Sequence, residues 1–296
     1  MNLIDALRRQ LGRNSRANLL HPDITRLLEI DPIFLAALEE ALALPEPNVQ
    51  ARDLAKVAAS ALIDRVYITN QFIQISSQAK ETLEGTYLRT WEHLIETKDI
   101  ESCLRNFHYP RLAEWIGELY PESLKRDLAF NAQIGQVSCQ NYSAELQLGL
   151  LKLDPDKLEQ PVLDVGCGRS AYLVEHLREK HISAYGLDRS VEAGKEYLKE
   201  GNWLETAFED CKWGTVLSHL AFSNHFAFVE KFHVDQTPIY VAKYQEILRS
   251  LKPGGSFIYA PSSLTLEQTV DRSQYSIERF PIGNGYAVTK VLKFAS

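Results

Sequence analysis

The chain has 296 residues, of which 45% are hydrophobic, and a formal charge of −7. These values are ordinary for a globular protein with material for one large domain or two smaller ones. The negative charge argues against a general affinity for nucleic acid. No apolar run approaches the length of a membrane span, so no membrane interaction is expected.

The first half predicts one helix after another. In residues 31–47, Asp31 can cap a helix, Pro32 suits its first position and Pro45 closes it. A second Pro-initiated helix is expected at Pro121. Apolar residues from Asp53 onward recur at helical spacing. Residues 66–75 alternate in places, which leaves a strand as the alternative to the helix that we favour.

Arginines near the N-terminus form the best candidate for a basic patch: Arg8, Arg9, Arg13 and Arg16. Their spacing favours one solvated helix face. The N-terminal apolar stretch is too short for a secretory signal. Cysteines stand far apart without a CxxC pair, at Cys103, Cys139, Cys167 and Cys211, which favours reduced thiols over disulfides or a zinc site. We therefore expect a cytoplasmic protein with no metal.

The second half alternates strands with helices. Strand-like runs occupy residues 161–165, 182–187, 215–220 and 256–259, and helices are expected after Ser170 and over 238–251. This alternation indicates an α/β fold with a doubly wound parallel sheet. The last twenty residues contain two strand-like runs around a Pro-Ile-Gly-Asn-Gly turn, which predicts a terminal antiparallel hairpin.

The segment PVLDVGCGRS, residues 161–170, combines a buried strand, an acid and two glycines. Gly166 and Gly168 allow a sharp turn that brings a cofactor close to bare backbone. Twenty residues later, Asp188 ends the second strand. A carboxylate there can accept hydrogen bonds from both ribose hydroxyls, and we favour this role over the alternative, a cap for the following helix.

At these landmarks, residues 143–296 resemble the class I S-adenosylmethionine-dependent methyltransferases, a superfamily with a Rossmann-like domain. LDVGCGRS resembles the family's first motif, with Ser170 in place of the usual third glycine, and GLDRS resembles the second. RSLKPGGSFIY resembles the turn into the fifth strand. The resemblance implies an all-helical cap or substrate domain over residues 1–142 and a cofactor-binding domain over 143–296.

The resemblance also implies roles for individual residues in binding S-adenosylmethionine. Asp164 would receive the ammonium of the cofactor, and the backbone from Gly166 through Cys167 to Gly168 would pass beneath it. Asn202 would pair with the adenine and Trp203 would flank the ring, unless Trp203 is a core residue. Cys167 is expected to be a small residue that fits the turn, not a nucleophile.

Polar residues that follow the fourth strand are candidates for the surroundings of the sulfonium. They are Ser218, His219, Ser223, Asn224 and His225, and we select Ser218 for cofactor binding and His219 and Asn224 for catalysis. The segment before the second half, residues 131–142, is rich in uncharged polar groups and could fold over the cofactor. Tyr142 is then a lid residue whose ring faces the sulfonium, and we select it as a third catalytic candidate. Alternatively, Asn141 or Ser143 caps a helix there.

The leading hypothesis is methyl transfer to a small-molecule acceptor. One alternative keeps the cofactor but transfers its aminocarboxypropyl arm, or closes that arm to azetidine-2-carboxylate, and releases methylthioadenosine. Another is a non-catalytic sensor of S-adenosylmethionine. The sequence does not indicate the acceptor or the oligomeric state.

Overall fold

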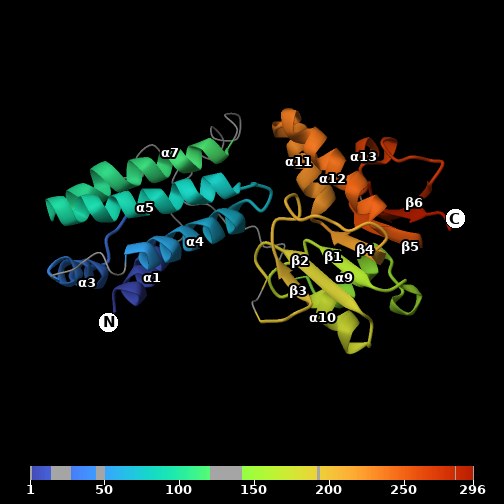
Figure 1. Cartoon of the computed structure of the whole chain (residues 1–296), viewed down its shortest axis with the longest axis horizontal. Helices are drawn as coiled ribbons and strands as arrows, with labels where there is room; N and C mark the ends of the chain where they lie inside the picture. Colours follow the sequence, from blue (N-terminus) through green and yellow to red (C-terminus); the bar gives the residue numbers. More distant parts are fainter. Residues whose placement is uncertain are drawn as a thin grey trace. The chain divides into compact units, whose positions relative to one another are not determined.

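The computed structural model describes residues 2–14, 28–44, 51–120, 142–191, 194–283 and 285–295. Its contacts divide the chain into two compact units, Met1–Val137 and Ser138–Ser296. The first unit is helical and the second contains a sheet with helices (Figure 1). Each unit is described by itself below.

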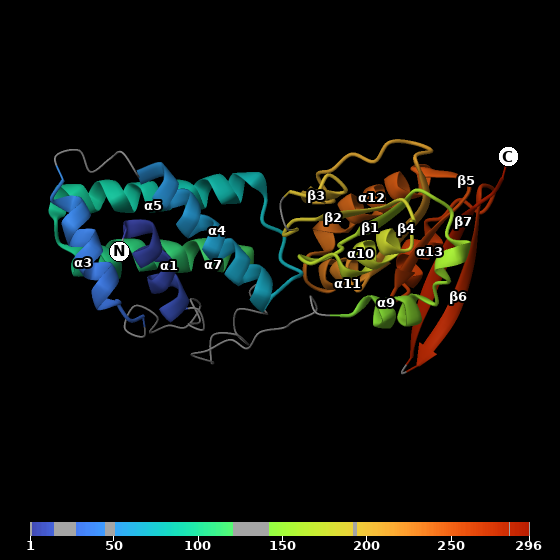
Figure 2. The same ribbon diagram turned by 90° about the horizontal axis from the view of Figure 1, so that it is seen from below.

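Long helices form the first unit. They are α1 (Leu3–Arg13), α3 (Pro32–Leu42), α4 (Ala51–Thr69), α5 (Ser77–Thr97) and α7 (Tyr109–Leu119), with the short α6 (Ile100–Ser102) and the π-helical η2 (Cys103–His108) leading into α7. Helices α4 and α5 pack against each other, as do α5 and α7 (Figure 2). The buried apolar side chains of this unit lie between these helices.

Local sequence signals set several of these helix ends. The Asp31 side chain accepts a hydrogen bond from the Ile33 N–H and Pro32 occupies the first turn, as expected. Helix α4 continues to residue 69, so the helical prediction for the stretch from 66 is confirmed up to that point, and residues 70–76 are neither helix nor strand. The helix expected at Pro121 lies outside the described residues.

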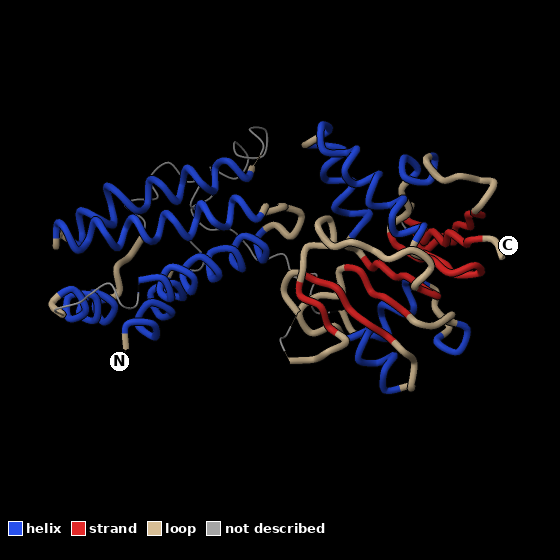
Figure 3. The backbone as a smooth tube through the Cα atoms, in the orientation of Figure 1, coloured by secondary structure: helices blue, strands red, loops and turns tan. Residues whose placement is uncertain are grey.

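The second unit is built on a seven-stranded sheet of order β3-β2-β1-β4-β5-β7-β6 (Figure 3). The strands are β1 (Val162–Val165), β2 (Ala184–Asp188), β3 (Leu198–Glu200), β4 (Trp213–His219), β5 (Leu251–Ala260), β6 (Tyr275–Gly283) and β7 (Tyr286–Lys293). The first five run parallel, and β6 and β7 form the antiparallel hairpin. The α/β prediction with a terminal hairpin is therefore confirmed.

Helices cover both faces of this sheet. They are α9 (Ala144–Leu151), α10 (Tyr172–Glu179), α11 (Phe222–Phe232), α12 (Thr237–Arg249) and α13 (Leu264–Gln268). Alternate residues of the strands belong to two hydrophobic cores, one on each face of the sheet, because successive side chains of a strand point to opposite faces. Leu163 and Val216 pack with α11 and α12, whereas Val162 and Leu217 pack with α10. The sheet is thus buried on both sides.

Strand β3 was missed by the sequence analysis. It is three residues long, with one residue half-buried and two exposed, so it has no apolar run to reveal it. The strand order reverses between β1 and β4, which flank each other in the centre of the sheet. In open α/β sheets, ligands bind beyond the carboxyl ends of the strands at such a reversal. The glycine turn after β1 and the polar segment after β4 meet at this edge.

The described residues also show the state of the cysteines and of the arginines near the N-terminus. Among the described residues, no helix is long and apolar enough to cross a membrane, and no cluster of potential metal ligands occurs. The three described cysteines are free, while Cys139 lies outside the described residues. Arg8, Arg9 and Arg13 each form an ion pair with a carboxylate. Arg16 lies outside the described residues.

Candidate cofactor and active site

The turn after β1 depends on its two glycines for different reasons. Gly166 and Gly168 have φ of +81° and +74°, in the left-handed region that favours glycine. A Cβ on Gly166 would overlap the Cβ of Ala221, whereas a Cβ on Gly168 would meet nothing within 4 Å. A side chain on Gly166 would therefore first meet protein, whereas Gly168 faces open space.

The side chain of Cys167 packs into the sheet. A Cβ on Gly186 of β2 would lie 2.7 Å from the Cys167 sulfur, so the glycine in β2 makes room for this thiol. Burial, and then the charges of Asp164 and Asp188, raise the pKa of the thiol. Cys167 is therefore a protonated packing residue whose contribution to the turn is its backbone, and a nucleophilic role is disfavoured.

Asp164 is a buried carboxylate in β1. Its side chain is 1% exposed, and neither carboxylate oxygen has a hydrogen-bond partner among the described residues. Burial, and then the charge of Asp188, raise the pKa of Asp164 to about 7. Buried carboxylates are normally paired or hydrogen-bonded, because an unpaired buried charge is costly. A cationic group bound beside this turn would remove that cost.

Asp188 braces the glycine turn from the end of β2. Its Oδ2 accepts a hydrogen bond from the Gly168 N–H at 3.0 Å. Its Oδ1 accepts from the N–H of Ser190 at 3.0 Å and from the Ser190 hydroxyl at 2.9 Å. The side chain is only partly buried, so a further donor can reach Oδ2. Asp188 thus orders both the glycine turn and the turn that follows β2.

The structure brings two of the three predicted catalytic residues together. The rings of Tyr142 and His219 meet edge to face, with 5.4 Å between their centroids. His219 ends β4, is largely buried, and has no partner for its Nε2 among the described residues. Burial lowers the pKa of His219 to about 4, so the imidazole is neutral near pH 7. A neutral ring with an unpartnered nitrogen can accept a proton.

Tyr142 also precedes a helix start. The Ser143 hydroxyl accepts a hydrogen bond from the Leu146 N–H and caps α9, so the alternative of a capped helix holds for Ser143. The Tyr142 carbonyl accepts from the side chain of Gln147 at 2.9 Å, which fixes the backbone beside the cap. The rest of the expected lid, residues 131–141, lies outside the described residues.

Asn224, the third predicted catalytic residue, has a local partner. Its Nδ2 donates to the carbonyl of Leu220 at 3.2 Å, one turn earlier in the chain. The half-buried side chain therefore supports the start of α11. The residues on either side of Asn224 are buried. The Ser223 hydroxyl has no hydrogen-bond partner among the described residues, and the ring of His225 packs against Trp203.

The hydroxyl of Ser218, which we selected as a cofactor ligand, is engaged inside the protein. Ser218 is fully buried, its hydroxyl donates to the Val165 carbonyl at 2.9 Å, and it accepts from the Phe222 N–H at 3.0 Å. Both hydrogen-bonding capacities of the hydroxyl are used inside the protein. Ser218 thus links the end of β1 to the start of α11 and fixes the position of the glycine turn relative to the segment that follows β4.

The predicted adenine contacts are also corrected in part. The Trp203 ring is buried and lies 5.1 Å from Phe222 and 5.6 Å from Tyr240, centroid to centroid, so it belongs to the aromatic core. The Asn202 Oδ1 accepts a hydrogen bond from the Leu204 N–H at 3.0 Å, which forms a local turn. Asn202 is half-buried and retains the capacity for a further contact.

A cavity of about 240 Å³ adjoins His219, and the sequence analysis did not predict its lining. The lining is mainly apolar and comes from α9, the ends of β4 and β5, and the hairpin: Leu150, Leu220, Ala260, Pro261, Ile282 and Tyr286. The hydroxyl of Ser262 beyond β5 is buried without a partner among the described residues. For Leu220 and Pro261, the position directly after the carboxyl end of a strand was the available sequence signal.

No family model and no curated protein matches the sequence. Among solved structures, the chain is similar to an S-adenosylmethionine-dependent methyltransferase from Mesorhizobium loti, with 12% identity, 52% of this chain and 100% of that chain covered, and a TM-score of 0.38. It is also similar to such a methyltransferase from Methanosarcina mazei, with 16% identity, 47% of this chain and 95% of that chain covered, and a TM-score of 0.32. A third similar methyltransferase, from Aquifex aeolicus, has 13% identity, 51% of this chain and 96% of that chain covered, and a TM-score of 0.32.

The sheet of the second unit has five parallel strands, and the antiparallel strand β7 lies between β5 and the edge strand β6. The second unit therefore has a Rossmann-like α/β fold with an antiparallel hairpin at one edge.

Proposed function

We propose that this protein is an enzyme that binds S-adenosylmethionine at the glycine turn and transfers its methyl group to a small-molecule acceptor. The observation that carries the proposal is the buried carboxylate of Asp164, which lacks a partner beside a turn with open space at Gly168. A fold alone does not define a function, so the argument depends on these groups.

The residues at the glycine turn fit the charge of this cofactor. Its ammonium would provide Asp164 with the charged hydrogen bonds that the protein does not supply. The interaction between Asp164 and Asp188 further favours a cation, because it raises the cost of the unliganded carboxylate. Asp188, held in place by the Gly168 N–H, would accept a hydrogen bond from the ribose. Asn202 would contact the adenine from its turn.

The neighbouring residues fit an acceptor site. The bound cofactor supplies an activated methyl group, so the protein mainly orients the acceptor and excludes water. The mainly apolar cavity beside His219 would hold the acceptor, and the neutral imidazole would receive its proton. Tyr142 packs on this imidazole and would restrict its orientation.

Other parts of the proposal concern the whole chain. We propose that residues 1–142 form a substrate domain and residues 143–296 a cofactor domain, and that the enzyme works in the cytoplasm on small molecules, not on nucleic acid. The absence of nucleic acid among the substrates is supported by the ion pairs of Arg8, Arg9 and Arg13, because these pairs reduce the positive charge that α1 could offer to phosphates.

The direct test is product analysis. Purified protein is incubated with S-adenosylmethionine labelled in the methyl group and with fractionated small molecules from a cell extract. We expect S-adenosylhomocysteine together with a labelled product, and neither in the Asp164→Ala variant. Methylthioadenosine as the product would contradict methyl transfer, and binding without any turnover would indicate a sensor.

A further inference from the structure

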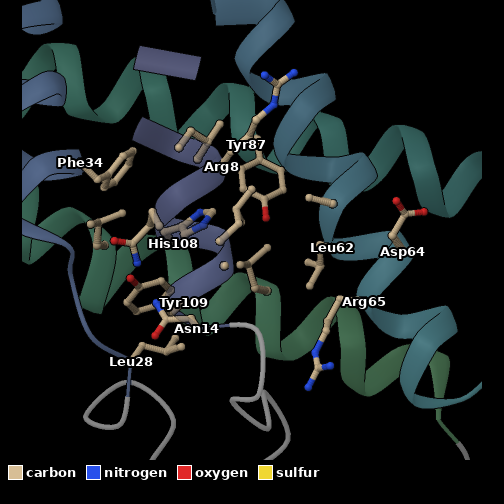
Figure 4. A pocket seen from close by; sticks show the side chains of 17 residues that line it. Arg8, Asn14, Leu28, Phe34, Leu62, Asp64, Arg65, Tyr87, His108 and Tyr109 are labelled. Carbon is tan, nitrogen blue, oxygen red and sulfur yellow. The ribbon is translucent and has the colours of Figure 1, made fainter. Parts of the chain in front are cut away.

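The helical unit contains a cavity of its own. Its volume is about 400 Å³, and its lining comes from α1, α3, α4, α5, η2 and α7. Apolar side chains make up about half of the lining and include Leu7, Leu11 and Leu112. Figure 4 shows Leu28, Phe34 and Leu62 among them. Small-molecule sites are typically about 300–1,000 Å³, mostly apolar, with a few placed polar groups. The cavity has the size and the lining of such a site.

A buried histidine supplies a hydrogen-bond acceptor to this cavity. The Thr90 hydroxyl donates to the Thr86 carbonyl at 2.8 Å, so its oxygen accepts the proton of His108 Nδ1 at 2.9 Å. His108 is therefore the tautomer with the proton on Nδ1 and a lone pair on Nε2. The side chain is 6% exposed, it lines the cavity, and Nε2 has no hydrogen bond among the described residues.

Two phenols flank this imidazole. The rings of Tyr87 and Tyr109 lie 5.0 and 5.6 Å from that of His108, centroid to centroid, and both line the cavity. Neither hydroxyl forms a hydrogen bond among the described residues. Burial lowers the pKa of His108 to about 4 and raises the pKa of Tyr109 to about 12. All three groups are uncharged near pH 7.

The other polar groups of the lining are used elsewhere or balance in charge. Gln10 and Asn14 both donate to the carbonyl of Glu29 at 2.8 Å, and Arg8 pairs with Asp5. Asp64 and Arg65 both line the cavity and carry opposite charges. A charged ligand of either sign would therefore lose its hydration and meet a like charge as well as an opposite one. A neutral ligand avoids this cost.

The backbone beside His108 is also unusual. Residues Cys103–His108 form a π-helical stretch between two α-helical segments. Such stretches are rare and occur often at functional sites. Here the stretch ends on the residue that carries the unpartnered acceptor, and Tyr109 follows at once.

We propose that the helical unit binds a small, neutral, aromatic molecule with a hydroxyl group, whose proton is donated to His108 Nε2 while Tyr87 or Tyr109 donates to its oxygen. The apolar side chains enclose the ring. This site is distinct from the glycine turn, and its occupancy does not depend on S-adenosylmethionine or on methyl transfer.

The test uses 2-naphthol and its methyl ether, 2-methoxynaphthalene, as probes of the full chain without cofactor. The two differ in the donated proton. We expect 2-naphthol to bind about tenfold more tightly in calorimetric titrations, the difference made by about one hydrogen bond. The His108→Phe variant should bind both probes equally and at the level of the ether. The matched His93→Phe variant, outside the cavity on α5, should retain the preference.

A second variant identifies the place of binding. Ala61→Trp should fill the cavity and abolish binding of both probes, while circular dichroism shows retained helix content and the affinity for S-adenosylmethionine is unchanged. Equal binding of the two probes by the wild type would overturn the proposal, as would no binding at about 1 mM or unchanged binding in a folded Ala61→Trp variant. Each of these results leaves the proposed methyl transfer untouched.

Discussion

The N–H of Gly168 donates a hydrogen bond to Asp188 Oδ2 at 3.0 Å. This bond joins two motifs that lie twenty residues apart, one after β1 and one at the end of β2. The open turn at Gly168 and the carboxylate expected to receive the ribose are thus parts of one structure. A change at Asp188 therefore alters both the ligand contact and the turn, and an experiment must separate the two effects.

The Asp188→Ala variant should bind S-adenosylmethionine about tenfold to a hundredfold more weakly, because hydrogen bonds to a charged group contribute about 1.5–3 kcal/mol. The ribose contribution is isolated with a 2′-deoxy analogue of the cofactor. Wild type should prefer the normal cofactor and Asp188→Ala should not, as measured by calorimetry. Ser190→Ala, which removes one donor to Oδ1, should keep the preference. A variant that still discriminates would show that Asp188 only braces the turn.

Asp164 should make cofactor binding depend on pH. The carboxylate must be ionised to hold an ammonium, and its pKa in the free protein is raised to about 7. Affinity should therefore fall by about tenfold per pH unit as the pH decreases below about 7. Calorimetry between pH 5.5 and 7.5 checks this slope. The Asp164→Asn variant should bind weakly and without that slope; an identical slope in the variant would assign the titration to another group.

The same carboxylate should lower the stability of the free protein. Its pKa lies above the ordinary value of 3.8, so the folded state disfavours ionisation of this carboxyl group. The cost is absent below about pH 4 and fully present above about pH 7. Asp164→Asn should therefore raise the free energy of unfolding of the α/β unit by up to about 4 kcal/mol at pH 8 and by less at pH 5. Equal effects at both pH values would contradict an unpaired carboxylate.

Gly168→Ala should impair binding with little effect on the fold. The new Cβ meets no protein atom within 4 Å, so it enters the space assigned to the cofactor, and the left-handed φ costs about 1–2 kcal/mol. Gly254→Ala is the matched control. Gly254 lies near the amino-terminal end of β5, has a φ of +78°, and a Cβ there would also meet no atom within 4 Å. Both variants should lose similar stability in thermal unfolding. Titration should show weaker cofactor binding only for Gly168→Ala.

Tyr142 should affect turnover more than cofactor affinity. Its ring packs against His219, so Tyr142→Ala would free the imidazole and admit water, which acts mainly on the transition state. Tyr142→Phe keeps the ring contact and should retain most activity. Steady-state kinetics with a measured dissociation constant separates the effects. Wild-type turnover in both variants would make Tyr142 a structural residue.

His219→Phe should lower turnover by about a hundredfold or more if the imidazole accepts the acceptor's proton. The phenyl ring preserves the contact with Tyr142 and removes the nitrogens. Because the pKa of His219 is lowered to about 4, the wild-type rate should show no loss from protonation of this residue between pH 6 and 8. A normal rate in the variant would show that His219 only packs against Tyr142.

Much of the α/β unit could be predicted because its signals are local. Buried parallel strands need continuous apolar runs, and a left-handed turn needs glycine, so β1 and Gly168 are visible in the sequence. Strand β3 is short and mostly exposed, and it is recognised only by its pairing with β2. The catalytic candidates were less predictable, because a polar residue after a strand can face either the site or the core.

The sequence by itself determined the parallel strands other than β3 and their alternation with helices, the terminal hairpin and the positions of Gly168 and Asp188, since each depends on neighbours along the chain. Only the tertiary structure decided which polar groups are satisfied. Ser218 finds two partners inside the protein, whereas Asp164 finds none among the described residues. His108, which the sequence did not single out, gains its cavity from helices far apart in the chain. Partner and burial are properties of distant residues brought together, and local patterns do not encode them.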